Sequence, residues 1–469
     1  MKILSRKYII LGIIVLIIIV PMFIGFFLKE EVKIPKNVTL NYWIVEGSEK
    51  DYQDIVSAFE NYHPYVKVNF KKVRLGEYQE TLIQAWARDK GPDIFTLPST
   101  WLKKYQEFIT PTPPKITTAY YESKKEFFRE SVEIKYHTKA SPTLNDIKNN
   151  YIDMIYDDIV LSNSQGKSQI YALPYSIDTL AVYYNKDLLN NAYIAQPAKT
   201  WNELVQQSSK LSLYDNQNNI LQSSIALGLS SNIEYYYEIL SLLMMQNGAN
   251  MISASGEKIS FNRSSESTNL GALALDFYTS FTNINKETYS WNSSQPESLD
   301  NFTSGKSAYY IGTLSDKSVI ASTPNLNYGL TEMFHINPSG TDRVLNKAGN
   351  PVKVNFGNYW VHTVSKKTKS LNEAWDLVQF IAREKRNRQY VEKTGKISPL
   401  RSILNIQKED PNLGIWARQA LTAKNWYTGN DASATKNYFA EMIEEVALEN
   451  KSSPKALNEA AEKIERTLE

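Results

Sequence analysis

The sequence predicts an α/β fold, in which parallel strands alternate with covering helices, preceded by one transmembrane helix at the N-terminus. Two observations predict this fold class. From residue 38 onward, short segments of alternating apolar residues take turns with longer segments whose apolar residues recur at helical spacing. Residues 8–28, in contrast, are apolar and contain no charge. A chain of 469 residues is long enough for roughly two to four domains.

Composition excludes several classes of protein. With 42% hydrophobic residues, the chain has enough apolar side chains for a packed core and is not disordered throughout. Lys and Arg number 52 against 50 Asp and Glu, so there is no positive excess to bind a nucleic-acid backbone. The chain has no cysteine, which excludes disulfides, thiolate metal sites and a cysteine nucleophile.

The first element is the apolar segment 8–28, which as a helix would span about 30 Å, the thickness of the hydrocarbon core of a bilayer. Lys and Arg precede this segment and a Lys-Glu-Glu run follows it, which orients residues 1–32 as a cytoplasmic N-terminus and anchor, with the rest outside. A cleaved signal peptide is the alternative. Its apolar core is usually about 7–15 residues long and is followed by small residues, so an uncleaved anchor is favoured.

The exported part begins with five elements in the order strand, helix, strand, helix, strand. Residues 38–45 alternate as a strand does, and residues 48–62 follow at helical spacing behind a capping-box pattern. Residues 66–70 predict a second strand, residues 78–86 a second helix and residues 93–97 a short buried strand. This order predicts a parallel sheet covered by helices.

The same alternation returns later in the chain. Strands are expected at residues 180–184, 308–311 and 360–364. Helices are expected where a cap residue precedes an apolar helical pattern, at Thr200, Ser370 and Ser453.

Between residues 110 and 148 the alternation weakens into a segment rich in Pro, Thr and Lys. We interpret residues 110–148 as an insertion and expect one amphipathic helix in it, around residues 124–132.

Taken in order, the segments from residue 38 to 469 resemble the extracellular sugar-binding proteins of ABC transporters, the family that includes maltose-binding protein. The most specific match is IYALPYSIDTLAVYYNKDLL, which is similar to the segment that passes between the two lobes in that family. The other matching segments are LNYWIVEG, AFENYHPYVKVNF, ARDKGPDIFTL, KTWNELVQQSSKL, FTSGKSAYYIG, FGNYWVHTVSKKTKSLNEAWDLVQFI and YVEKTGKISPLRS. The chain departs from the family in its transmembrane anchor, which replaces a lipid-modified cysteine, and in the 110–148 insertion.

The resemblance implies a two-lobed fold of the periplasmic-binding-protein type, with a ligand cleft between the lobes. The first lobe would hold residues 38–172 and 357–404, and the second residues 173–356 and 405–469.

The two lobes would be joined by chain crossings that change conformation on closure. These are expected at residues 172–179, at residues 355–358, where Gly357 would supply backbone freedom, and near residues 404–412.

The same resemblance implies that the protein captures a carbohydrate outside the cell and delivers it to an ABC permease. It would act as a monomer, with no catalysis, no cofactor and no metal. Hydroxyl groups of sugars bind carboxylates and amides, and their C–H faces lie on aromatic rings. Ligand-binding residues are therefore expected at Glu46, Thr100, Trp101, Asp178, Tyr235, Tyr236, Gly312, Thr313, Tyr359, Trp360 and Trp426.

Each of these residues also has a purely structural interpretation. Glu46 can be a solvated loop acid, Asp178 can cap a turn and Trp101 can belong to the core. Successive residues on a helix point about 100° apart, so only one or two of the tyrosines 235–237 can face a cleft. Successive strand residues face opposite sides, so only one of the two aromatic residues 359–360 should contact ligand.

Two other classes of function stay open. An enzyme that cleaves surface glycans would need a pair of carboxylates, which sequence cannot exclude among 50 acids. No metalloprotease motif, nucleophile elbow or P-loop is present, and residues 215–219 predict a polar hairpin turn rather than a calcium loop. A ligand sensor or adhesin with the same cleft is the second alternative, and a peptide, glycerol phosphate or polyamine could replace the sugar.

Overall fold

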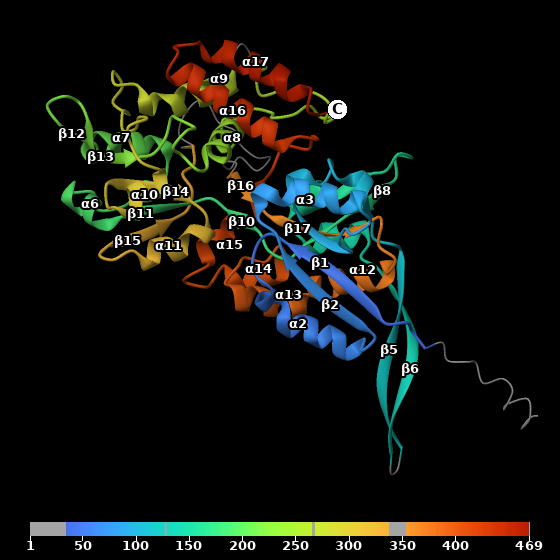
Figure 1. The fold of residues 1–469 in the computed structure, drawn as a ribbon. Coiled ribbons are helices and arrows are strands. Elements are labelled where there is room, and N and C mark those ends of the chain that lie inside the picture. Colours follow the sequence, from blue (N-terminus) through green and yellow to red (C-terminus); the bar gives the residue numbers. More distant parts are fainter. Residues whose placement is uncertain (1–33, 127–128, 265–267, 337–352, 469) are drawn as a thin grey trace, which may run out of the picture.

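The computed structural model describes residues 34–126, 129–264, 268–336 and 353–468 (Figure 1). The expected transmembrane segment, residues 8–28, lies outside the described residues. Within the described ranges, every helix is too short or too polar to cross a membrane. Two separate sheets, each with its own helices, build a two-lobed α/β molecule.

The first lobe is built on a six-stranded mixed sheet. Parallel β1 pairs with β2 and β3, antiparallel β17 extends the sheet, and β9 pairs with β17. Its path is β2-β1-β3-β17-β4, and its strands are β1 (Val38–Ile44), β2 (Val66–Lys72), β3 (Ile94–Pro98), β4 (Ile109–Thr110), β9 (Leu173–Pro174) and β17 (Trp360–Ser365). The predicted strand and helix alternation of residues 38–98 is confirmed.

Helices cover both faces of this sheet. α2, α12 and α13 pack against one another, and Figure 1 shows α3 on the opposite side of the sheet from α2. α2 begins behind Ser48, where the predicted capping box with Asp51 is present. The helices of this lobe are α2 (Glu49–Tyr62), α3 (Leu75–Ala87), α4 (Leu144–Asn150), α5 (Asp153–Ile159), α12 (Leu371–Ala382) and α13 (Glu384–Thr394).

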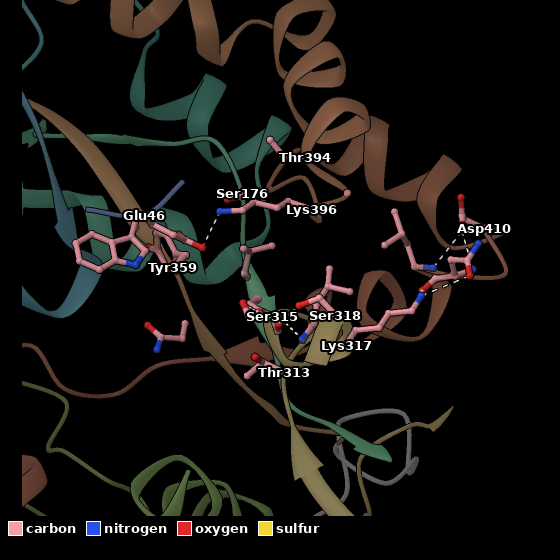
Figure 2. A pocket seen from close by; sticks show the side chains of 18 of the residues that line it. Glu46, Ser176, Thr313, Ser315, Lys317, Ser318, Tyr359, Thr394, Lys396 and Asp410 are labelled. Carbon is pink, nitrogen blue, oxygen red and sulfur yellow. Dashed lines mark hydrogen bonds and ion pairs between the residues drawn. The ribbon is translucent and has the colours of Figure 1, made fainter. Parts of the chain in front are cut away.

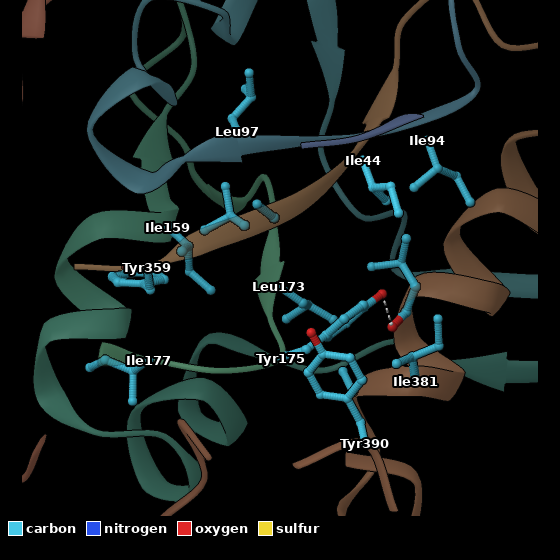
Figure 3. Packing of buried hydrophobic residues seen from close by; sticks show 14 of the residues in the cluster. Ile44, Ile94, Leu97, Ile159, Leu173, Tyr175, Ile177, Tyr359, Ile381 and Tyr390 are labelled. Atoms are coloured by element: carbon cyan, nitrogen blue, oxygen red, sulfur yellow. Dashed lines mark hydrogen bonds between the residues drawn. The ribbon is translucent and has the colours of Figure 1, made fainter. Parts of the chain in front are cut away.

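The core of the first lobe is rich in aromatic side chains. Figure 3 shows Tyr175 beside Tyr390 in this core, with Leu173 and Ile177 in the same cluster. The ring of Tyr175 stacks on that of His362 with centroids 3.7 Å apart, and the Tyr175 hydroxyl donates to the Val378 carbonyl. Residues 173–177 lead from this sheet toward the second lobe, and buried contacts hold them in the first lobe.

The second lobe is built on a five-stranded sheet of order β12-β13-β14-β11-β15. Its strands are β11 (Ala181–Asn185), β12 (Leu213–Tyr214), β13 (Ile220–Ile225), β14 (Ser307–Gly312) and β15 (Tyr328–Thr331). The predicted polar turn between β12 and β13 is confirmed, because the Asp215 carboxylate accepts the N–H groups of Gln217 and Asn219. The central strand of this sheet, β14, ends at Gly312, next to the cleft.

The helices around this sheet bury a second apolar core. Thr200 caps α7 and accepts the N–H of Glu203, as predicted. These helices are α6 (Lys186–Asn191), α7 (Trp201–Leu211), α8 (Tyr236–Gln246), α9 (Leu270–Thr279), α10 (Ser298–Thr303), α11 (Lys317–Ser322), α16 (Ala432–Ala447) and α17 (Ser453–Glu465).

A three-stranded sheet lies between the two lobes, and we call it the crossing sheet. It consists of β10 (Asp178–Thr179), β16 (Asn355–Asn358) and β18 (Ala423–Lys424). β10 pairs antiparallel and β18 parallel with β16. Two of its strands lie in the segments where crossings were expected.

The third strand of the crossing sheet lies farther along the chain than residues 404–412, where a third crossing was expected. Residues there form the end of α14 (Arg401–Gln407) and a turn, and α15 (Gly414–Ala420) follows before β18 supplies the third strand. Gly357 also differs from expectation, because its φ is not positive. A Cβ there would lie 2.7 Å from Met154 Sδ and 3.0 Å from Ala423 Cβ, so the glycine provides space rather than backbone freedom.

The insertion corrects another prediction. A helix was expected around residues 124–132, but β5 (Lys115–Glu126) and β6 (Arg129–Ala140) pair as one antiparallel hairpin. The apolar residues at 132, 134 and 136 recur with period two, which fits a strand and not a helix. Figure 1 shows the hairpin extending away from the first lobe. A smaller hairpin follows, of β7 (Val160–Ser162) and β8 (Ser168–Ile170).

Candidate ligand-binding cleft

A cavity of ≈ 800 Å³ lies along the crossing sheet, between residues of both lobes. The ends of several elements meet there (Figure 2). The first lobe contributes Glu46 after β1, Trp360 at the start of β17 and Lys396 after α13, among others. The other lining residues are Ser176, Ile177, Asp178, Tyr235, Thr313, Leu314, Ser315, Lys317, Ser318, Ala321, Asn358, Tyr359, Thr394, Gly395, Asp410, Asn412 and Leu413.

Asp178 connects the crossing sheet to the second lobe. Its carboxylate accepts the N–H of Leu314 at 3.1 Å and the hydroxyl of Ser315 at 3.1 Å, as well as the N–H of Thr179. Burial raises the pKa of Asp178 to about 6, although these donors act in the opposite direction. The carboxyl group of Asp178 is therefore mostly ionised at neutral pH and takes up a proton in mildly acidic solution.

A second buried carboxylate, Asp316, accepts hydrogen bonds from residues on the second-lobe side of the cavity. The hydroxyl of Tyr235 donates to both of its oxygens, at 3.1 and 3.0 Å, and the Thr313 N–H donates at 2.8 Å. The hydroxyl of Tyr310 donates to it as well. Burial raises the pKa of Asp316. Tyr235 and Thr313 thus reach the cavity in orientations fixed by one buried acid.

Two lysines bring positive charge to the cavity. Lys396 Nζ lies 2.6 Å from Glu46 Oε1. Burial acts to lower the pKa of Lys396, but Tyr390 and Glu46 outweigh it, so this pKa is raised and the ammonium stays charged. Lys317 donates to the Asn412 carbonyl oxygen at 3.0 Å, and burial lowers its pKa. Lys396 is positioned by Gly395, which ends α13 with φ +67°.

The two aromatic residues after β16 differ in their surroundings. The Tyr359 hydroxyl donates to Asp158 at 2.8 Å, and the Tyr359 side chain is buried. Trp360 is only partly buried and also lines the cavity. An aromatic ring that is partly exposed in a cleft can offer its face to the apolar side of a ligand.

A second cavity of ≈ 440 Å³ also borders the crossing sheet, and Asn358 lines both cavities. Thr100 and Trp101 face it from the first lobe, and Tyr237 and Glu238 face it from the second. One carboxylate oxygen of Glu238 is buried without a hydrogen-bond partner, and the other lies 3.6 Å from Lys436 Nζ.

The remaining candidate residues line neither of these two cavities. The Trp426 side chain is 5% exposed and its indole N–H donates to Ser241 at 3.0 Å. The Tyr236 hydroxyl donates to the Lys436 carbonyl oxygen. Gly312 is the last residue of β14, where a Cβ would meet the Tyr310 ring at 2.3 Å. The structure thus brings Glu46, Asp178, Tyr235, Thr313, Tyr359 and Trp360 together in one cavity and places Thr100 and Trp101 in the other.

Sequence reasoning did not identify several polar residues that line the cleft. Ser315 and Lys317 directly follow Thr313, so the end of β14 was a signal for them. Lys396 follows a glycine in a segment that was used only for the resemblance. Asn412 lies in the segment where a third crossing was expected, and Glu238, which lines the second cavity, directly follows tyrosines 235–237. Both segments were therefore signals that sequence reasoning did not use for these two residues.

The chemistry of the cleft is that of a binding site for polar groups. Carboxylates, lysines, hydroxyls and amides supply both acceptors and donors, and Trp360 supplies an apolar face. In the part of the chain that the structure describes, no three His, Asp or Glu side chains are grouped so that they could hold a metal ion.

Comparison with known proteins places the chain among binding proteins. Residues 54–441 match the family model of bacterial extracellular solute-binding proteins. A cyclo/maltodextrin-binding protein complexed with maltotetraose is 17% identical, with a TM-score of 0.68 over 93% of this chain and 98% of that one. The GacH receptor of Streptomyces glaucescens, solved with acarbose, is 15% identical, with a TM-score of 0.65 over 92% and 99%.

The maltose-binding periplasmic protein MalE of Listeria monocytogenes, in complex with maltose, is 15% identical, with a TM-score of 0.65 over 92% of this chain and 97% of that one. These likenesses show the two-lobed fold. The match to the family model covers most of the sequence, from the first helix of the exported part to α16. The chain belongs to the family of bacterial extracellular solute-binding proteins.

Proposed function

We propose that this protein captures a carbohydrate, an oligosaccharide, outside the cell and delivers it unchanged to an ABC importer. The observation that carries the proposal is the ≈ 800 Å³ cavity between the lobes, which combines carboxylates and lysines with the partly exposed Trp360. The similar structures carry maltotetraose, acarbose and maltose, which supports a sugar over a peptide or a polyamine.

The proposed contacts follow from the geometry of the cleft. Glu46, Asp178 and Lys396 would bind ligand hydroxyl groups, while Trp360 would lie against a sugar ring. Tyr235 and Thr313 would contact the ligand from the second lobe.

The proposed mechanism is closure of two lobes around the ligand. The first lobe would hold residues 38–172 and 357–404 and the second residues 173–356 and 405–469, joined by the crossing sheet. A ligand that contacts both walls binds the closed state better and shifts the population toward it. The protein would act as a monomer and would carry no cofactor.

We also propose that residues 8–28 tether the protein to the membrane, with everything after them outside. The uncharged length of this segment and the positive charges before it support the tether. A tether would raise the effective concentration of the binding protein near its permease.

The proposal is tested by screening the thermal unfolding of the protein against a panel of oligosaccharides, amino acids and polyamines. A ligand that binds only the folded state raises the melting temperature by mass action. We expect an oligosaccharide to raise it, and Trp360→Ala to abolish the shift. A shift with polyamines alone, or release of shortened sugars during incubation, would contradict the proposal.

A further inference from the structure

The hairpin β5–β6 has two chemically different faces. On one face, Lys135 Nζ lies 2.9 Å from Glu122 Oε2 and 3.4 Å from Glu133 Oε2. His137 Nε2 lies 3.1 Å from Glu122 Oε1 on the same face. Because side chains alternate along a strand, the residues between these belong to the other face.

That other face carries four apolar side chains along its middle part, with Thr117 and Thr138 on the same face toward the base of the hairpin. We call the four apolar residues the hairpin face: Tyr121, Val132, Ile134 and Tyr136. Tyr121 pairs with Ile134 across the two strands. The Val132 side chain is 66% exposed and that of Tyr136 is 49% exposed. Tyr121 and Ile134 are half-buried and pack against the core of the first lobe, and Val132 and Tyr136 extend this apolar strip into solvent. A continuous apolar strip on a projecting ribbon indicates a surface that contacts something.

The base of the hairpin is fixed to the first lobe by a buried carboxylate. Asp376, whose side chain is 1% exposed, accepts the hydroxyl of Thr118 at 2.7 Å, and Lys139 Nζ lies 3.5 Å from it. His63 and Arg383 lie 3.5 and 3.8 Å from the same carboxylate. Since Thr118 belongs to β5 and Lys139 to β6, both strands are attached, and the hairpin keeps one direction relative to the lobe.

The chain enters the first lobe at this same base. The Val38 N–H donates to the Tyr65 carbonyl oxygen at 2.8 Å, and the Ala119 N–H of β5 donates to the Tyr65 hydroxyl at 3.2 Å. Figure 1 shows the start of β1 beside the hairpin. The nine residues 29–37 span at most about 30 Å when extended. The hairpin, with 12 residues in each strand, is about 40 Å long.

These lengths limit how far the hairpin can lie from a bilayer that holds the tether. If residues 8–28 sit in a bilayer, the base of the hairpin is never farther than about 30 Å from its surface. The hairpin is longer than that distance. The bilayer is therefore a partner that the tether keeps permanently within reach of this face. Tyrosine and aliphatic side chains are suited to the boundary between lipid headgroups and acyl chains.

We propose that the hairpin face lies on the outer surface of the phospholipid bilayer, with the charged face of the hairpin turned to water. The proposal rests on the membrane tether proposed above. The hairpin then acts as a second support beside the tether and sets the orientation of the cleft relative to the membrane.

The chain has no cysteine, so single cysteines can be labelled without background. The full chain is reconstituted in phosphatidylcholine vesicles with an environment-sensitive fluorophore at Val132→Cys. The matched control is Glu133→Cys, the next residue on the opposite face, which is 47% exposed. Leu221→Cys, 59% exposed on the second lobe, is the remote control.

We expect a blue shift of the emission, loss of quenching by aqueous iodide and quenching by brominated lipid at Val132→Cys only. Equal iodide quenching at all three positions would overturn the proposal. Protection at Val132→Cys that brominated lipid does not quench, and that grows with protein density, would overturn it in favour of a second copy of the chain.

Flotation of the same vesicles distinguishes a failure of the proposed tether from a failure of the proposed hairpin contact. If the chain does not float with the lipid, the tether is wrong and the hairpin proposal fails with it. If the chain floats but Val132→Cys stays accessible to water, only the hairpin proposal fails. Sugar binding by the labelled proteins, measured in parallel, reports on the cleft independently of either outcome.

Discussion

At the scale of single residues, Asp178 is a carboxyl group of the cleft that titrates in mildly acidic solution. Its carboxylate is held by donors from β10 and from the loop after β14, and burial raises its pKa to about 6. An acid whose pKa is raised above the unfolded value of 3.8 stabilises the folded protein at low pH. That contribution is lost as the pH rises through the interval between the two values.

Ligand affinity should therefore depend on pH. Hydroxyl groups of a sugar donate to the ionised carboxylate, so binding favours the charged form of Asp178 and affinity should rise as the pH increases through about 6. Calorimetric titrations at a series of pH values measure this directly. Asp178→Asn should remove the pH dependence, and an unchanged profile in that variant would assign the titration to another group.

Trp426 provides the opposite case, an aromatic residue whose contacts are structural. Its ring lies 5.7 Å from that of Phe439 and 6.0 Å from that of Phe261, and its N–H is bonded to Ser241. Trp426→Ala should lower the free energy of unfolding by about 3–5 kcal/mol, because it leaves a cavity in the second core. Urea unfolding without ligand measures this loss. Trp360→Ala is the control and should weaken sugar binding with a much smaller loss of stability.

The comparison of these tryptophans shows what a sequence can predict about a site. Resemblance placed Trp101, Trp360 and Trp426 at loop or strand ends, and all three positions were correct in that respect. The direction of each side chain depends on packing from distant segments, such as α8 and α16 against Trp426. That packing is not encoded near the residue itself.

At the scale of elements, the crossing sheet depends on a close approach at Gly357. A Cβ at this position would meet the end of the Met154 side chain and Ala423 Cβ of the neighbouring strand. Gly357→Ala should cost about 1–3 kcal/mol of stability, the usual range for overpacking a well-filled site. Met154→Ala in the same background should recover part of the loss by making room. Thermal unfolding of both variants measures these changes in stability. A Gly357→Ala protein as stable as the unchanged protein would contradict the predicted overpacking.

The insertion shows why one element was predicted incorrectly. Residues 124–132 contain charges at many spacings, so a helical pattern could be found there, although the apolar residues at 132, 134 and 136 alternate. Residues 124–126 pair with residues 129–131 inside this segment, so it folds back on itself as the end of a hairpin. The rest of the two strands and the Asp376 anchor, which lie outside the segment, stabilise that hairpin. The regular alternation of residues 38–98 had no such competitor, and its elements were predicted correctly.

At the scale of the whole molecule, the two lobes are also joined away from the crossing sheet. Lys103, in the loop after β3, donates to the carbonyl oxygen of Leu468 near the end of the second lobe at 2.7 Å. A hydrogen bond from a charged group contributes about 1.5–3 kcal/mol, which is enough to change the balance between two lobe arrangements.

Lys103→Met should therefore shift the ligand-free protein toward a wider separation of the lobes. Small-angle X-ray scattering should show a larger radius of gyration without ligand, and a saturating sugar should restore the smaller value. Ligand affinity should fall in the same variant, because more free energy is needed for closure. An identical scattering curve for the two proteins would show that this bond does not influence the lobe arrangement.

The pairing within the crossing sheet has one further consequence. Because β10 and β18 are both hydrogen-bonded to β16, none of the three can rotate about its own backbone while its neighbours stay still. Three separate flexible connections would let the lobes twist, slide and bend in many directions. One bonded ribbon leaves a single bending axis across its strands, so the lobes would return to the same mutual alignment after each cycle of release.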